Sequence, residues 1–488
     1  MKLYLMTAMV LAGLCTMSEA APKSKKNQGN LGNVVYIGDS ITHGFGAPSY
    51  RWALHKIFVD NGIEYNEIGV EEKSHSGGVE PGTSYIGRQF ANTHAAYSGQ
   101  RAYETSGRDH EKSPRLDKTD IFDWLEIEGK ADSDKRRLGA VPDTAVILLG
   151  TNDLLSDHKS ISKSITTVQK ALLNKKNGDM CVIVNALLTK NKNTRVYVLA
   201  VPAWGETASG NTQPKDYEVV LKGYNSKLRK TFKKEFVDIN EYMIDVANEE
   251  KMQGVADFLN ARDKLHPSQQ GDLLIAGQVA RAMGIAGRSA GLPRKAASAF
   301  DMGAQAVLAA AATKEGVASA GKGLTIAPGK KLEMLWTEED NKERPFAVEL
   351  RVAPGDGAKD GWRKEPLVQL TLGRCGCYGQ LGVSESYIMW GKKVLCAYNM
   401  SKLTEPIRVA WVPGSESLGV QRGFYVWLGD MLIGEGLPDA DEKVPGVRLE
   451  NLSDKEISIA DLAVDKAASA PTTKLLVKKA AEVVQDEN

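Results

Sequence analysis

The chain has 488 residues, about three times the ~150 residues of an average domain, so several packed units are expected. Its 62 basic and 61 acidic residues give a net charge of +1. That balance argues against nucleic acid as a partner, because phosphate binders generally carry a basic excess or a basic face. Apolar residues make up 42% and charged residues 25%, close to globular averages, which excludes global disorder.

The first 20 residues have the pattern of a secretory signal peptide. A short positive start precedes an apolar run at residues 3–17 and a small-residue cleavage site at residues 18–20. The run is too short for a typical membrane span, and no later segment approaches the ~18 uncharged residues needed. We therefore expect an exported protein without a membrane span. Lipid attachment at Cys15 is the less favoured alternative, because Leu14 stands directly before that cysteine.

From residue 33 to about residue 283, β-branched runs alternate with segments of helical period. Strands are expected at residues 34–37, 144–149, 195–201 and 236–239, and helices at residues 51–61, 161–175 and 273–283. This alternation predicts a parallel sheet with helices on both faces. Ligands of such sheets bind beyond the carboxyl ends of the strands, so the chemistry is expected directly after an apolar run.

The pattern changes after residue 284. A stretch rich in Ala, Gly and Ser predicts a linker, and the short strand-like runs that follow predict an antiparallel sandwich. These runs lie at residues 331–336, 345–352, 367–372, 386–390, 394–398, 407–412, 424–433 and 457–464. The predicted units are a signal peptide at 1–20, an α/β domain at 21–284, a linker at 285–330, a β-sandwich at 331–465 and a tail at 466–488.

Removal of the signal peptide leaves four cysteines, Cys181, Cys375, Cys377 and Cys396. If they are extended, Cys375 and Cys377 point to one sheet face, from which either could pair with Cys396 on a neighbouring strand. Buried free thiols are the alternative. No second Cys pair or His pair has the spacing of zinc ligands, so no metal site is expected.

Two short segments contain a nucleophile and a base. A Gly-Asp-Ser turn that ends at Ser40 directly follows the first predicted strand. A serine on such a turn is exposed and presents its own N–H to the same space, which suits a nucleophile with an adjacent oxyanion donor. An Asp-x-x-His segment supplies His266 as base and Asp263 as the carboxylate that fixes its tautomer. Taken alone, each segment is better explained as an ordinary turn or a helix cap.

Two further segments supply hydrogen-bond donors. Asn152 follows the strand predicted at residues 144–149, and its side-chain amide could donate to a developing oxyanion. Gly99 can bring its backbone N–H close to a ligand, because no side chain stands in the way.

Together, Ser40, Gly99, Asn152 and the Asp263 and His266 pair follow the chain order of the SGNH hydrolase family, or GDSL esterases, which residues 33–283 resemble. The resemblance implies a flavodoxin-like, three-layer hydrolase domain without a cofactor. It implies that Ser40 is the nucleophile, His266 the base and Asp263 its orienting partner. The oxyanion hole would consist of the Ser40 and Gly99 N–H groups and the Asn152 side chain. Residues 71–97 depart from the family's pattern, which leaves the shape of the acyl pocket undefined.

The resemblance also implies ester hydrolysis through an acyl-serine. Exported members of this family with an appended β-domain are often similar to carbohydrate O-deacetylases. The expected substrates are therefore small acyl esters, chiefly acetyl, on sialic acid, mucin glycans or polysaccharides. A lipid acylhydrolase is the alternative with the same chemistry. A non-enzymatic glycan-binding protein is a third, against which the intact set of Ser40, Asp263 and His266 argues.

Three residues are candidate substrate contacts. Trp204 follows a predicted strand at the ligand-binding end of the sheet, where it either walls a pocket or packs within a loop. His94 precedes the Gly99 segment and either lines the site or is solvated. Asp39, next to Ser40, is the third. His43 is only three residues from Ser40 and is expected to shape the loop rather than act as the base.

The β-domain resembles a lectin-type jelly roll, chiefly in residues 424–433. Alternation places Tyr425 and Trp427 on one face of this run. A solvent-facing pair could stack on a sugar ring and bind glycan. If both faces are buried in the sandwich, the pair has no such role.

Overall fold

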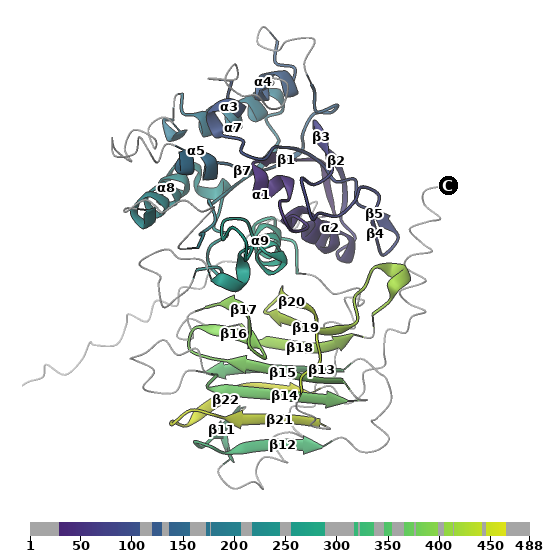
Figure 1. The fold of residues 1–488 in the computed structure, drawn as a ribbon, viewed down its shortest axis with the longest axis vertical. Coiled ribbons are helices and arrows are strands. Elements are labelled where there is room, and N and C mark those ends of the chain that lie inside the picture. The colour runs from purple at the N-terminus through teal and green to yellow at the C-terminus, as the bar shows by residue number, and fades with distance from the viewer. Residues whose placement is uncertain are drawn as a thin grey trace, which may run out of the picture.

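The computed structural model shows an α/β domain stacked on a β-domain (Figure 1). It describes residues 29–107, 120–128, 136–156, 172–175, 177–205, 217–244, 255–287, 317–320, 323–335, 346–353, 366–374, 377–398, 405–412, 414–441 and 446–464. The predicted signal peptide, the tail at 466–488 and most of the helix predicted at 161–175 lie outside these ranges. Within them, no helix has both the length and the apolar character that crossing a membrane requires.

A mostly parallel sheet forms the centre of the α/β domain. Its strands are β1 Asn30–Gly38, β2 Glu64–Ile68, β3 Glu71–Glu72, β6 Thr93–Ala96, β7 Thr144–Leu148, β8 Arg195–Leu199 and β9 Phe236–Val237. β1, β7, β8 and β9 follow one another in parallel. On its other side β1 pairs in parallel with β2 and, at its carboxyl end, with β6. Only β3 runs antiparallel, against β6. The four strands expected in this domain are confirmed.

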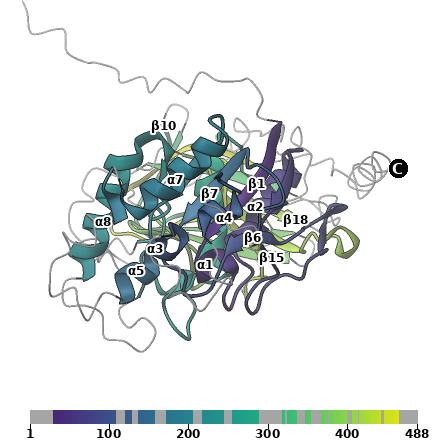
Figure 2. The same cartoon turned by 90° about the horizontal axis from the view of Figure 1, so that it is seen from above.

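Helices cover both faces of this sheet. The longer ones are α2 Tyr50–Asp60, α7 Asp179–Lys190, α8 Tyr217–Phe232 and α9 Gln269–Ala282. Alternate side chains of β1 divide between two apolar clusters. Val34 and Tyr36 pack in the cluster that contains α2 and α9, whereas Val35 and Ile37 pack in the cluster that contains α7 and α8. Figure 2 shows α7 and α8 lying across the strands on the side away from the β-domain. The three-layer arrangement is thus confirmed.

The β-domain is a sandwich of two antiparallel sheets, as expected. The first has the order β10-β11-β22-β13-β18-β19-β20 and the second the order β12-β21-β14-β15-β16-β17. The strands of the first are β10 Val317–Ala320, β11 Gly323–Ile326, β13 Phe346–Ala353, β18 Ile407–Val412, β19 Gly423–Leu428, β20 Met431–Leu437 and β22 Ile457–Val464. Those of the second are β12 Lys331–Leu335, β14 Val368–Arg374, β15 Cys377–Val383, β16 Tyr387–Trp390, β17 Lys393–Ala397 and β21 Gly446–Asn451.

The structure corrects three expectations for this region. β10 and β11 lie within the linker predicted at residues 285–330, and β11 pairs with β22, so these two strands form one edge of the sandwich. The run at 424–433 is a hairpin of β19 and β20 rather than one strand, with Gly429 at φ 58° in its turn. β15 has no counterpart in the prediction because its glycines weaken the strand pattern. Gly379 is needed there, since a Cβ would lie 2.3 Å from the Trp390 ring.

Both faces of β19 are buried, so of the two alternatives for Tyr425 and Trp427 the one without a sugar-stacking role is confirmed. Tyr425 and Trp427 are 0% and 5% exposed, and their rings stack on each other with centroids 6.1 Å apart. The Tyr425 hydroxyl donates to the Gln421 carbonyl at 2.8 Å. These two side chains pack inside the protein and are not available to a glycan.

The described cysteines are free and buried. Cys377 and Cys396 do not pair with each other, and Cys181 is also a free thiol. Burial raises the pKa of the Cys396 thiol well above its ordinary value. Cys375 lies outside the described residues, so its pairing stays a prediction.

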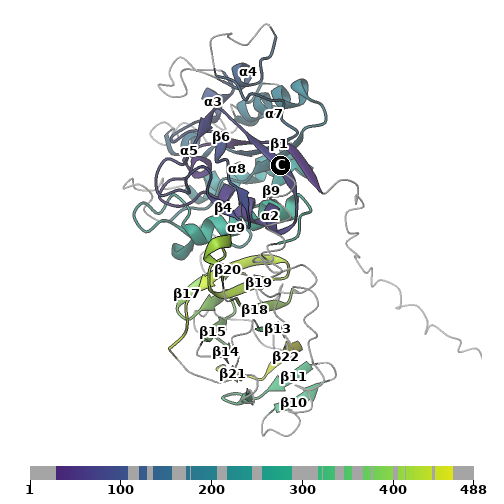
Figure 3. The same ribbon diagram turned by 90° about the vertical axis from the view of Figure 1, so that its right-hand side faces the viewer.

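The β-domain contacts the α/β domain through α9, which packs on β20 (Figure 3). Gly277 makes this approach possible, because a Cβ there would lie 2.6 Å from the Met431 side chain. A second contact comes from the loop between β18 and β19, where the Leu418 carbonyl accepts from the Ile86 N–H at 2.9 Å. Ile86 sits in the turn of a hairpin formed by β4 Ser84–Tyr85 and β5 Arg88–Gln89.

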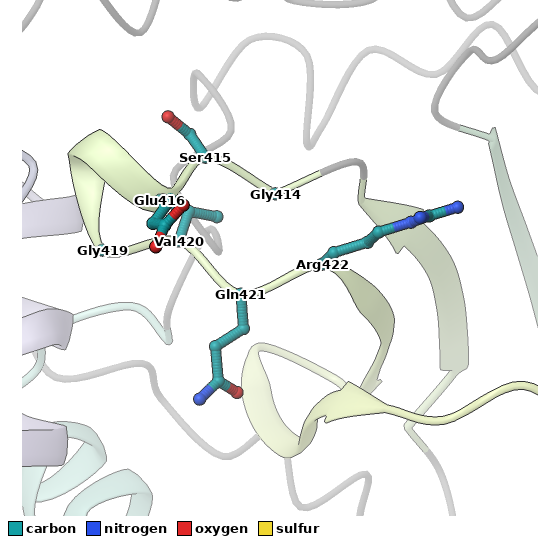
Figure 4. A pocket seen from close by; sticks show the side chains of 7 residues that line it. All are labelled: Gly414, Ser415, Glu416, Gly419, Val420, Gln421 and Arg422. Carbon is teal, nitrogen blue, oxygen red and sulfur yellow. The ribbon is translucent and has the colours of Figure 1, made fainter.

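A cavity of about 490 Å³ lies beside the same loop (Figure 4). Its described lining comes entirely from that loop and consists of Gly414, Ser415, Glu416, Gly419, Val420, Gln421 and Arg422. Arg422 points away from Glu416 in this view and approaches the Trp411 ring. The cavity therefore belongs to the β-domain and not to the carboxyl ends of the parallel strands, where the chemistry is expected.

Candidate active site

Ser40 lies at the carboxyl end of β1, at the start of the short helix α1 Ser40–His43. Gly38 lets this helix sit tightly over the strand ends. A Cβ at Gly38 would lie 2.1 Å from the Thr42 Oγ1 atom and 2.9 Å from the Leu148 carbonyl oxygen. Ser40 itself is 8% exposed. The nucleophile candidate thus occupies the expected edge of the sheet in a tightly packed turn.

Both ends of α1 are held by buried side chains. At its start, the Asp39 carboxylate accepts from the Ile41 N–H at 3.0 Å. At its end, the Arg51 guanidinium donates to the Thr42 carbonyl at 2.7 Å and to the His43 carbonyl at 3.4 Å. Last-turn carbonyls have no partner within a helix, and Arg51 satisfies them here together with the Ser49 hydroxyl, which also donates to the Thr42 carbonyl at 2.9 Å. Ser40 is consequently presented on a helix fixed at both ends.

His266 and Asp263 reach Ser40 from a turn just before α9. The His266 Nε2 atom lies 2.7 Å from the Ser40 Oγ atom, and its Nδ1 atom lies 2.8 Å from the Asp263 Oδ2 atom. The other Asp263 oxygen accepts from the Leu265 and His266 N–H groups at 2.9 and 3.0 Å. Lys264, at φ 53°, makes the turn that allows this geometry. The structure thus brings together the three residues expected to form the triad.

The Asp263 carboxylate is held in its charged form. Burial alone would raise its pKa, but hydrogen bonds from the Leu265 and His266 N–H groups and from the His266 ring outweigh burial and lower the pKa. A charged Asp263 keeps the Nδ1 proton on the imidazole and leaves Nε2 to accept the serine proton. This orientation is the one that a general base requires.

The Ser98, Gly99 and Gln100 segment is tied to the start of helix α5 Thr151–Ser156. Asn152 donates from Nδ2 to the Gln100 carbonyl at 3.0 Å, and Asp153 accepts from the Ala102 N–H at 2.9 Å. Gly99 has φ 82°, a conformation that glycine adopts without strain. The two segments expected to supply oxyanion donors are therefore bound to each other.

Three N–H groups of these segments are left over for a ligand. Within the described ranges, neither the Ser40 N–H nor the Gly99 N–H donates a hydrogen bond. The Asn152 amide carries two N–H bonds, and one of them is used on Gln100. That bond fixes the amide plane and leaves the second N–H available. The arrangement is consistent with an oxyanion hole.

The three candidate substrate contacts lie behind the site and not in it. Trp204 is 1% exposed and packs in the apolar cluster with β7 and β8, so it is a packed loop aromatic. His94 is fully buried, with Nε2 2.7 Å from the Lys73 carbonyl and Nδ1 accepting from the Ala96 N–H. Asp39 is fully buried and caps α1. Their burial excludes direct contact with substrate.

Two residues of the site have no signal in the sequence. Arg51 lies on α2 and is fully buried, although an arginine in a helical run indicates only a solvated face. Phe45 follows the Gly-Asp-Ser turn, and its ring packs on the His266 ring with centroids 4.4 Å apart. Its partner lies more than two hundred residues away in the chain, which no local pattern reveals.

The geometry is that of acyl-transfer chemistry. A serine hydroxyl contacts an imidazole whose other nitrogen is held by a carboxylate, next to N–H groups that have no partner in the described part of the chain. Such a set lowers the barrier for attack on an acyl carbon and stabilises the oxyanion that results.

Comparison with known proteins adds three findings. Residues 36–274 match the model of the GDSL-like lipase/acylhydrolase family. A search of curated proteins gave no match. Solved structures similar to this chain include a carbohydrate esterase family 3 protein from Talaromyces cellulolyticus, with 18% identity and a TM-score of 0.34 over 51% of this chain and 94% of that one.

Two other solved structures have comparable scores. An acetyl esterase mutant with acetate ion has 17% identity and a TM-score of 0.33, over 51% of this chain and 94% of that one. A gut microbial diltiazem-metabolizing enzyme has 17% identity and a TM-score of 0.33, over 52% of this chain and 47% of that one.

Proposed function

Residues 36–274 form a domain of the GDSL-like lipase/acylhydrolase family, and on that basis we propose that the protein is a serine esterase that removes small acyl groups, chiefly acetyl, from carbohydrates. The observation that carries the proposal is the contact chain from Ser40 through His266 to Asp263. The N-terminal signal pattern is the basis for proposing that the enzyme is exported.

In the proposed reaction, Ser40 attacks the ester carbonyl while His266 takes the hydroxyl proton at Nε2. The oxyanion accepts hydrogen bonds from the Ser40 and Gly99 N–H groups and from Asn152. His266 then returns the proton to the oxygen of the departing alcohol as the carbonyl–oxygen bond breaks, which leaves an acyl group on Ser40. Water, deprotonated by His266, attacks this ester, and His266 passes that proton to the Ser40 oxygen as the acyl–oxygen bond breaks, which releases the acid and restores the enzyme.

The exposed or partly exposed side chains around the catalytic residues support a polar alcohol rather than a lipid. They are polar or aromatic and comprise Phe45, Tyr97, Ser98 and Asn152, which are partly exposed, and His75, which is exposed. Low exposure of the catalytic pair supports a small acyl group, since Ser40 and His266 are each 8% exposed. A long acyl chain would need an apolar channel that starts at the serine.

The test is hydrolysis by the purified mature protein of acetyl and octanoyl esters of one alcohol, together with a panel of O-acetylated glycans. We expect acetyl esters to be preferred and at least one glycan to lose acetate. Ser40→Ala should lower kcat by about 10⁴-fold or more, as for other catalytic serines. Ser417→Ala, an exposed serine of the β-domain, is the matched control.

Two results would contradict the proposal. Activity that survives Ser40→Ala would remove Ser40 as nucleophile. A preference for octanoyl over acetyl esters would replace the carbohydrate substrate by a lipid and leave the serine chemistry intact.

A further inference from the structure

Residues 71–97, which depart from the family's pattern, close one side of the catalytic site. Their backbone binds the loop that follows α1. The His75 N–H donates to the Gly44 carbonyl at 3.1 Å, and the Gly46 N–H donates to the Ser76 carbonyl at 2.8 Å. A Cβ at Gly46 would lie 2.3 Å from the Asn260 amide, so this loop also packs on the turn that carries His266. The loop that follows α1 is therefore held between residues 71–97 and the turn that carries the catalytic histidine.

Phe45, on this loop, marks the side of the site from which the alcohol departs. In the proposed reaction His266 gives its Nε2 proton to the alcohol oxygen, so the alcohol must lie against the His266 ring. The Phe45 ring packs on that imidazole, and the His75 ring lies 5.1 Å from Phe45. The oxyanion donors Gly99 and Asn152 come from other segments. Phe45 and His75 thus adjoin the alcohol and not the oxyanion.

His43 adds a hydrogen-bond donor to the surface formed by Phe45 and His75. Its ring lies 5.5 Å from the His75 ring, and its Nδ1 atom lies 3.4 Å from the Ser98 hydroxyl. Burial, with smaller effects from Arg51 and His75, lowers the pKa of His43 to about 4, so the ring is neutral at physiological pH. If Nδ1 accepts from Ser98, the proton sits on Nε2, which has no hydrogen-bond partner among the described residues.

The three neighbouring imidazoles, His43, His75 and His94, do not form a metal site. Within the described part of the chain, no group of three or more His, Cys, Asp or Glu side chains is arranged to hold an ion. His94 is occupied at both ring nitrogens, whereas His75 is exposed and Phe45 is partly exposed. With the His43 proton on Nε2, the surface that remains has one exposed ring, one partly exposed ring and one neutral N–H donor.

That combination fits a pyranose ring, whose faces carry C–H groups and whose rim carries hydroxyls. Aromatic faces attract the C–H surface, and a neutral donor binds a hydroxyl without favouring an anion. We propose that Phe45, His75 and His43 form a subsite for the sugar ring of the departing alcohol. Phe45 and His75 stack on its apolar face, and His43 donates from Nε2 to a hydroxyl. This subsite rests on the proposed function and adds to it the residues that select the alcohol.

The experiment compares two acetate esters, a mono-O-acetylated methyl glucoside and ethyl acetate, which differ only in the alcohol. For each variant we compare kcat/KM for the sugar ester with kcat/KM for ethyl acetate. In His75→Ala we expect this ratio to fall about three- to tenfold, because one ring contact to the sugar is lost. The fall should come mainly from a higher KM for the sugar ester. His75→Phe keeps a ring and should restore most of the ratio. Glu72→Ala, an exposed neighbour on the same insertion, is the matched control.

Failure of the subsite and failure of the function have different signatures. If the wild-type protein cleaves the sugar ester and His75→Ala leaves the ratio unchanged, the subsite is wrong and the esterase function stands. An equal fall for both esters, or no recovery with His75→Phe, also overturns the subsite. If the wild-type protein cleaves ethyl acetate and no sugar ester, the carbohydrate function fails and the subsite with it.

Discussion

Asp39 shows how a residue beside the nucleophile can be essential to its placement without contacting substrate. Its carboxyl is fully buried and caps the helix that begins at Ser40. Burial raises its pKa from the ordinary value of 3.8 to about 7, although the Ile41 N–H acts in the opposite direction. An unfolded aspartate loses its proton near pH 4. Between these values the folded state binds more protons, so the free energy of unfolding falls as pH rises from about 4 to about 7.

Asp39→Asn keeps an oxygen for the Ile41 N–H and has no proton to lose. We expect the stability of this variant relative to wild type to increase as pH rises from about 4 to about 7, by at most about 4 kcal/mol. Urea denaturation at a series of pH values measures this difference. The exposed Asp454, changed to Asn in the same way, is the matched control. A difference that does not change with pH would contradict the raised pKa.

At the scale of elements, α9 joins the catalytic turn to the β-domain. Its cap, Ser268, follows His266 by two residues and accepts from the Gly271 N–H. Gln270, in the first turn, donates from Nε2 to the Leu395 carbonyl at 2.8 Å and to the Ile433 carbonyl at 2.6 Å. These carbonyls belong to β17 and β20, the last strands of the two sheets. One amide therefore satisfies an edge of each sheet, where unpaired backbone groups are costly.

Replacement of Gln270 by Leu should destabilise the protein by about 2–6 kcal/mol, because two buried carbonyls lose their donor at roughly 1–3 kcal/mol each. The midpoint of urea denaturation reports the loss. Gln269→Leu changes the exposed neighbour of the same residue type and should cost much less. Equal effects of the two substitutions would show that the bridging amide contributes no stability.

At the scale of the whole molecule, ion pairs connect the two domains, and one of them is buried. Lys56 on α2 lies 2.7 Å from the Glu435 carboxylate on β20, and both side chains are 7% exposed. Arg281 on α9 contacts Glu405 at 2.8 Å and Asp430 at 3.0 Å. A buried charge that loses its partner costs far more than a pair replaced together. The interface is therefore specific for this pairing of surfaces.

Lys56→Met should lower the free energy of unfolding by about 3–5 kcal/mol, since it leaves the Glu435 carboxylate buried without the ammonium. The double variant Lys56→Met with Glu435→Gln should recover more than half of that loss. A double-mutant cycle followed by chemical denaturation gives the coupling energy. If the destabilisation of the double variant equals the sum of the values for the two single variants, the two groups do not stabilise each other across the interface.

The sequence by itself determined the local features of the site. A strand that ends at a Gly-Asp-Ser turn places Ser40 at the sheet edge, and the short Asp-x-x-His spacing lets Asp263 orient His266 within one turn. The hydrophobic periods of β1, α2 and α9 can likewise be recognised within each segment of the sequence, so the three-layer domain could be predicted. Of the strands missed in the β-domain, β10, β11 and β15 are short or rich in glycine, whereas β21, with six residues and one glycine, is neither.

Only the tertiary structure decided which side chains face the substrate. Trp204, His94 and Asp39 have the right chemistry and the right place in the chain, yet segments distant in sequence bury all three. Phe45 and His75 gave no signal, and residues 71–97 bring His75 against the Phe45 ring, which packs on His266. Residue type and spacing encode local geometry, whereas exposure depends on what the rest of the chain packs against each residue.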